Sequence, residues 1–140
     1  MTPAELKKEL TARGLLVYRT LPEGVALAEY ERENLLVDAG IRVTVAPGYG
    51  VTSRFRVEQH AFPGEAEEQL FGRARALALG TGVPNMQEIR AESRAQTSPS
   101  DPQRVMDTFF EVTYFAATDT LDGAIELARR LIAAARSLGG

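Results

Sequence analysis

The stretch from Ala91 to Thr118, AESRAQTSPSDPQRVMDTFFEVTYFAAT, decides the fold that the sequence predicts. It contains two runs in which small or apolar residues alternate with polar ones, separated by the polar segment TSPSDPQR. Successive side chains of a strand point to opposite faces, so two such runs predict an antiparallel hairpin. The polar segment is longer than a tight turn requires. We therefore expect a flexible polar tip at about residues 96–104.

The polar side of the first run alternates in charge. Its residues are Glu88, Arg90, Glu92 and Arg94. Such a face can be solvated, or it can pair its charges with a neighbouring copy of the same chain. Arg54 and Arg56, on the outward side of an earlier predicted strand, allow the same two interpretations.

The second run carries aromatic residues on both of its sides. Phe110 and Tyr114 lie on one side, and Phe109 and Phe115 lie on the other. One side should face the core. Large apolar groups on the other side then predict a cover, supplied by the C-terminal helix or by a second subunit.

The rest of the chain predicts three helices and four more strands. Thr2 as N-cap, Pro3 in the first turn and Glu5 at N3 predict a first helix that ends at Gly14. Alternation and turn residues predict strands near residues 15–20, 25–30, 41–45 and 51–57, with residues 31–34 as a charged connection. Residues 35–37 could extend a strand or stand alone. Helices are expected from Pro63 to Gly80 and from about Thr120 to Leu138.

The resulting order of elements is α-β-β-β-β-α-β-β-α. Because strand–helix–strand alternation does not persist, we expect an antiparallel (mixed) β-sheet with helices packed on one face, an α+β fold. A chain of 140 residues is long enough to bury a hydrophobic core, so we expect a single domain, 1–140.

Composition narrows the classes of function. The chain is 44% hydrophobic and 25% charged, as in ordinary globular proteins, and no apolar run approaches the ~18 residues of a membrane span. The N-terminus lacks an apolar signal core. We therefore expect a soluble, cytoplasmic protein with no membrane partner. A net charge of −3 argues against a general nucleic-acid binder, and we expect no sequence-specific nucleic-acid partner.

The sequence shows no grouping of residues typical of catalysis. Without cysteine there are no disulfides, thiolate nucleophiles or zinc–sulfur sites. His60 is the only histidine, so it is interpreted as a structural or surface residue. Residues 47–50, PGYG, lack the P-loop pattern, and Asp101 and Asp107 lack a metal-binding D-x-D arrangement. We predict no catalytic residues, no cofactor and no metal, and a protein that is not an enzyme.

The order of several segments along the chain is informative. Residues 21–30 have the sequence LPEGVALAEY, and the predicted strands at residues 41–45 and 55–57 come next. An alanine-rich helix follows at residues 61–77, then an I-x-A strand at residues 89–91 and an aromatic strand at residues 109–112. In this order the segments resemble small minor capsid and tail terminator proteins of tailed phages, with residues 21–30 similar to a segment near the start of that family and residues 41–45 and 55–57 similar to its central strands. The resemblance spans about residues 15–116, and the chain departs from it by adding about twenty helical residues.

The resemblance implies a structural protein of the virion that is made in the host cytoplasm. Such proteins form rings, often of six subunits, which cap the tail tube and meet the head-completion proteins. The polar tip would be a contact loop that is ordered on assembly. The expected subunit or partner contacts are Arg54, Arg56, Arg90, Glu92, Arg94, Ser98, Asp101, Arg104, Phe109 and Phe115.

A second resemblance leads to an alternative. Small acidic secretion chaperones also begin with a helix, continue through an antiparallel sheet and end with an apolar-striped helix. They are dimers that bind extended segments of client proteins. The final helix fits this alternative better, whereas the Leu-Pro turn and the long hairpin fit the phage family better.

Overall fold

The computed structural model describes residues 1–45 and 48–139, with side chains up to residue 134. Pro47 of the predicted hairpin loop and the side chain of Leu138 therefore lie outside the described residues. The elements are α1 (Pro3–Ala12), β1 (Val17–Leu21), β2 (Gly24–Arg32), β3 (Leu35–Thr44), β4 (Gly50–Glu58), the 3-10 turn η1 (Gln59–Ala61), α2 (Glu67–Gly80), β5 (Gln87–Ser98), β6 (Asp101–Ala117) and α3 (Leu121–Gly139).

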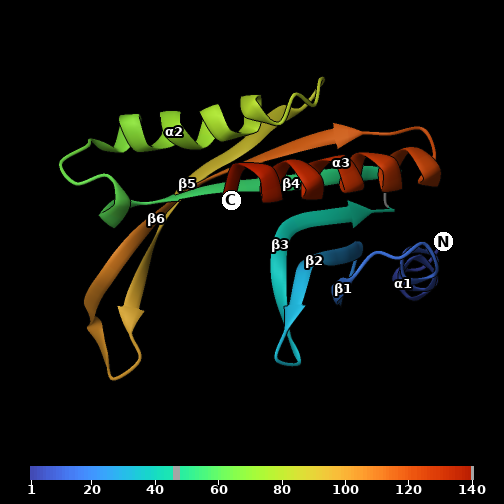
Figure 1. Ribbon diagram of the computed structural model, residues 1–140, viewed down its shortest axis with the longest axis horizontal. Helices are drawn as coiled ribbons and strands as arrows, with labels where there is room; N and C mark the ends of the chain where they lie inside the picture. The colour runs from blue at the N-terminus through green and yellow to red at the C-terminus, as the bar shows by residue number, and fades with distance from the viewer. Residues whose placement is uncertain (46–47, 140) are drawn as a thin grey trace.

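The strands form one six-stranded sheet in the order β1-β2-β3-β4-β6-β5 (Figure 1). Every pair of neighbouring strands is antiparallel. The α+β class and the predicted order of elements are confirmed. Residues 35–37, whose place the sequence left open, form the start of β3.

The three helices pack on one face of this sheet. Helix α2 lies on β4 and β6, α3 lies on β3 and β4, and α1 covers β1 and β2 (Figure 1). The apolar stripe of α3 explains its position, because its residues recur at helical spacing and are buried: Ala124, Ile125, Ala128, Leu131 and Ile132. They share a core with Leu6 and Leu10 of α1 and with the inward side chains of β2, β3 and β4.

The predicted helix starts are correct for α1 and four residues early for α2. The Thr2 hydroxyl accepts from Glu5 N at 3.2 Å, and the Glu5 carboxylate accepts from Thr2 N at 3.2 Å, a complete capping box. Helix α2 begins at Glu67 instead of near Pro63, because Gly64 adopts a φ of +82° and interrupts any helix before it.

Both long hairpins have tighter turns than the sequence predicted. Strand β2 continues to Arg32, and only Glu33 and Asn34, with φ of 52° and 66°, connect it to β3. Between β5 and β6 the predicted polar loop is wrong as well, because only Pro99 and Ser100 lie between the strands and Ser98 pairs with Asp101. Strand pairing continues through most of this segment, although register shifts at Gln96–Thr97 and Thr97–Ser98 leave residues 102–104 of β6 without a pairing partner.

The β5–β6 hairpin extends well beyond the helix layer. Its far end and the β2–β3 turn project to the same side of the molecule, away from α2 and α3 (Figure 1). We call residues 95–108 the arm. Most of the arm's side chains are exposed, and Ser98, Asp107 and Thr108 are half-buried.

Candidate functional site

The face of the sheet opposite the helices carries most of the residues that the sequence analysis singled out. We call it the open face. Strand pairing fixes its members, because directly paired residues point to the same side. Arg54 of β4 pairs with Thr113 of β6, and Thr113 also pairs with Arg90 of β5. The open face thus includes Arg54, Arg56, Arg90, Glu92, Arg94, Phe109 and Phe115.

A buried carboxylate organises the charges of this face. The Glu111 side chain is only 5% exposed, although strand pairing places it on the face opposite the helices. Arg54 Nε lies 3.5 Å from its Oε2, and Arg94 Nη2 lies 3.0 Å from its Oε1, without the alignment of a hydrogen bond. Removing either cation would leave a largely desolvated negative charge with one partner, which is costly.

The aromatic residues of the open face are covered by neighbours on the same face. The guanidinium of Arg56 lies 4.4 Å from the centre of the Phe109 ring and that of Arg94 lies 5.8 Å from it, in cation–π geometry. Phe115 lies against Gly50, where a Cβ would come within 2.5 Å of the ring. The C-terminal helix is therefore not the cover of these phenylalanines, because α3 packs on the opposite face.

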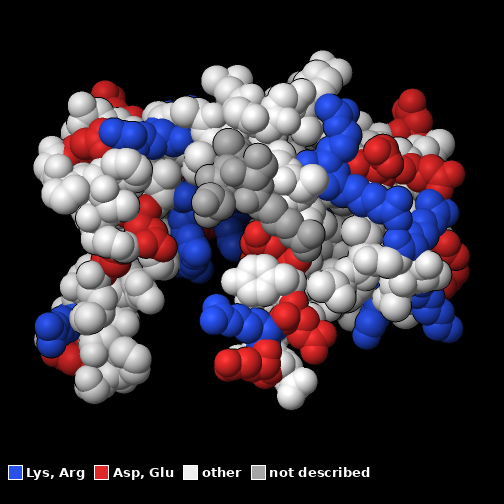
Figure 2. Space-filling view, in the orientation of Figure 1, with Lys and Arg blue, Asp and Glu red and all other residues white. Residues whose placement is uncertain are grey.

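A groove of about 420 Å³ runs across the open face between the two projecting hairpins. Figure 2 shows the hollow, with basic side chains in its depth. Arg42, Arg54 and Arg90 line it together with Asp38 and Glu23. Arg54 Nη2 lies 3.6 Å from Asp38 Oδ2, and Arg90 Nε lies 3.6 Å from Glu92 Oε1. The groove thus presents fixed charges of both signs.

Three of the predicted contact residues lie elsewhere, on the arm. Ser98 and Asp101 flank the turn, and Arg104 follows on β6. The Ser98 hydroxyl lies 3.1 Å from that of Ser100, and Asp101 Oδ1 accepts from Gln103 N at 3.1 Å. Local hydrogen bonds hold Ser98 and Asp101, and none of the three residues lines the groove.

Glu88 was expected on the same face as Arg90, and that prediction is wrong. A β-bulge between Glu88 and Arg90 shifts the register by one residue. Glu88 consequently points to the helix layer, where its carboxylate accepts from Arg75 Nε of α2 at 2.7 Å. This ion pair lowers the pKa of Glu88.

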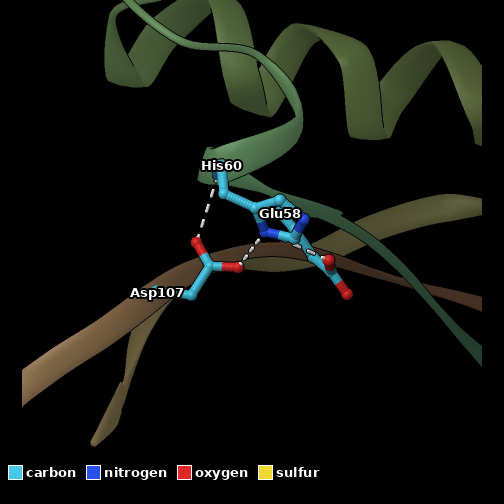
Figure 3. Close-up of side chains that lie close together, drawn as sticks. All are labelled: Glu58, His60 and Asp107. Carbon is cyan, nitrogen blue, oxygen red and sulfur yellow. Dashed lines mark hydrogen bonds and ion pairs between the residues drawn. The ribbon is translucent and has the colours of Figure 1, made fainter.

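Sequence reasoning missed a second cluster, formed by Glu58, His60 and Asp107 (Figure 3). His60 Nδ1 lies 2.5 Å from Asp107 Oδ2 and 3.4 Å from Glu58 Oε2. The backbone N–H groups of His60 and Thr108 both donate to Asp107 Oδ1, at 3.2 and 2.8 Å. Glu58 and His60 are close in sequence, but only the pairing of β4 with β6 brings Asp107 to them.

The hydrogen bond in this cluster perturbs both partners. The bond from Asp107 raises the pKa of His60, and the Asp107 charge adds to the effect. The same bond lowers the pKa of Asp107. Both shifts favour the charged forms, as expected for an imidazolium beside a carboxylate.

The chain was compared with known protein families, proteins and structures. No protein-family model, curated protein or solved structure matches the chain. Among the residues that the structure describes, no helix combines the length and apolar character needed to cross a membrane.

Proposed function

We propose that the protein is a structural component of a phage virion, similar to a tail terminator or head-tail joining protein. Copies of the chain form a ring that caps the tail tube and meets the head-completion proteins. It assembles in the host cytoplasm and acts in the virion by contact, without catalysing a reaction. The sequence resemblance over residues 15–116 supports this proposal.

The observation that carries the proposal is the open face of the sheet. A one-layer cover of helices leaves the opposite face to solvent or to a partner. On this face the groove is bordered by Arg42 and Arg90 and by Asp38 and Glu23, so it offers charges of both signs to a copy of itself. Charges of both signs fix the register of like subunits and exclude wrong partners.

The arm gives a second support. Its strands are paired up to the two-residue turn except at residues 102–104, so it projects as a formed hairpin. Val105 and Met106 expose 57% and 56% of their surface on it. Exposed apolar side chains on a projecting hairpin are typical of a contact with another chain.

A dimeric secretion chaperone is the alternative, favoured by α3. This helix buries an apolar stripe on the sheet at the end of the chain, as the alternative expects. The two functions differ in assembly, because a chaperone of this kind stops at two copies.

The test is to reverse one charge of the open face. Arg90→Glu is suitable because the Arg90 side chain is 58% exposed and, among the residues that the structure describes, forms an ion pair only with Glu92. Reversal of Arg94 is unsuitable, since it would place a second carboxylate beside buried Glu111. Lys7→Glu, at an exposed position of α1, is the matched control because it changes the net charge equally.

We expect Arg90→Glu to lose the assembled form in light scattering and negative-stain images, while Lys7→Glu keeps it. The free energy of unfolding of both variants should lie within about 0.5 kcal/mol of that of the natural protein, as is usual for surface substitutions. An Arg90→Glu protein that still forms the same assembly would remove the open face from the contact.

A further inference from the structure

We propose that Glu58, His60 and Asp107 form a binding site for a divalent transition metal, with Zn²⁺ as the representative ion. The site lies where β4 ends, η1 begins and the arm joins the body of β6 (Figure 3). It stands independently of the proposed function.

The donor set suits this class of metal. One imidazole nitrogen and two carboxylate oxygens are ligands that Zn²⁺ accepts, and a bound water completes the four-coordinate shell when three come from protein. Neither Glu58 nor Asp107 forms an ion pair with an arginine or lysine among the described residues. With neutral His60 the cluster carries two negative charges, which match a dication.

The three donor atoms lie within 4.8 Å of one another, and one of the spacings already fits a tetrahedral site. Metal–ligand bonds of about 2.0–2.1 Å place neighbouring ligand atoms about 3.3 Å apart. The 3.4 Å between His60 Nδ1 and Glu58 Oε2 already meets this value. The 2.5 Å between His60 Nδ1 and Asp107 Oδ2 has to widen by about 0.8 Å when the metal replaces the shared proton.

One ligand is fixed and two can adjust. The Asp107 side chain is 9% exposed, and two backbone N–H groups hold its Oδ1 so that Oδ2 points at the imidazole. The His60 and Glu58 side chains are 66% and 41% exposed, so both can rotate toward the ion. Fixed orientation of a ligand by outer hydrogen bonds is the usual support of a metal site.

The site also has room for the ion and its water. A surface hollow of about 220 Å³ lies beside it, lined by Gln59, His60 and Asp107 and by Val105, Met106 and Thr108. An ion in this place would join the end of β4 to the base of the arm and stabilise their relative positions.

The experiment is a ZnCl₂ titration of the untagged, EDTA-treated protein, followed by calorimetry and by NMR of the imidazole. Since His60 is the only histidine, its ring signals report coordination without ambiguity. We expect one Zn²⁺ per chain, a change of the His60 ring signals and a higher Tm. MgCl₂ at the same concentration should neither bind nor change the His60 signals or the Tm, because Mg²⁺ prefers oxygen ligands and retains its bound waters.

Variants separate the site from surface binding. His60→Ala, Asp107→Asn and Glu58→Gln should each weaken Zn²⁺ binding at least about tenfold, because each removes or neutralises one of only three ligands. Glu68→Gln, an exposed carboxylate on α2, should leave binding unchanged. The proposal is overturned if Zn²⁺ leaves the His60 ring signals unmoved, or if His60→Ala binds Zn²⁺ as tightly as the natural protein.

Discussion

Adjacent residues of β6 have opposite surroundings, because the strand turns successive side chains to different layers. Phe110 is 6% exposed and lies under α2, with its ring centre 5.2 Å from that of Phe71 in an edge-to-face arrangement. Phe109 lies on the open face beneath two arginines. The contribution of an aromatic side chain to the free energy of unfolding therefore depends on which face of the sheet it lies on.

Phe110→Ala should destabilise the protein by about 3–5 kcal/mol, because it opens a cavity in a closed core. Phe109→Ala should cost only about 1 kcal/mol, since water can fill its place and mainly cation–π contact is lost. Urea unfolding of the two variants measures both values. An equal loss of unfolding free energy in the two variants would contradict this, because it would mean that Phe109 is buried as fully as Phe110.

The His60–Asp107 pair predicts a pH dependence of stability. His60 has its pKa raised above the ordinary 6.5, so its contribution is complete below 6.5 and is lost as the pH rises through the raised value. Asp107 has its pKa lowered below the ordinary 3.8, so its contribution is present above 3.8 and is lost as the pH falls through the lowered value.

The Tm difference between the natural protein and His60→Ala, measured in EDTA, should therefore be largest between pH 3.8 and 6.5. It should shrink on both sides of this window. A difference that grows steadily toward alkaline pH would show that the hydrogen bond does not hold the charged pair.

At the scale of elements, the alternation of side chains predicted the strands and most of the open face. It failed at Glu88, because a bulge changes the register without a mark in the alternating pattern. It also failed at residues 96–104, whose polar composition indicates a loop although strand pairing continues there. The Glu58–His60–Asp107 cluster needed the pairing of β4 with β6, which no local pattern contains.

The arm should be dispensable for folding. Replacing residues 97–106 with Asn-Gly joins Gln96 to Asp107, which are paired residues, through a two-residue turn of favourable type. The removed side chains are nearly all exposed, so thermal unfolding followed by circular dichroism should show little change. Assembly should weaken, because the proposed contact is gone. A shortened protein that fails to fold would show that the arm belongs to the core structure.

At the scale of the whole molecule, the chain has one closed layer and one open one. Helices α1, α2 and α3 bury the apolar side of the sheet, whereas the opposite side carries the groove, the buried Glu111 and the projecting arm. Sequence alone predicted this division between layers. The identity of the partner proposed for the open face depends on a second chain, which a single sequence does not specify.

Self-assembly is the central claim, and the mass of the purified protein in solution tests it most directly. Light scattering should give a multiple of the 15.3 kDa chain that corresponds to a closed ring of about six copies, and negative-stain images should show rings. A tight dimer without rings would contradict the account and favour the chaperone alternative.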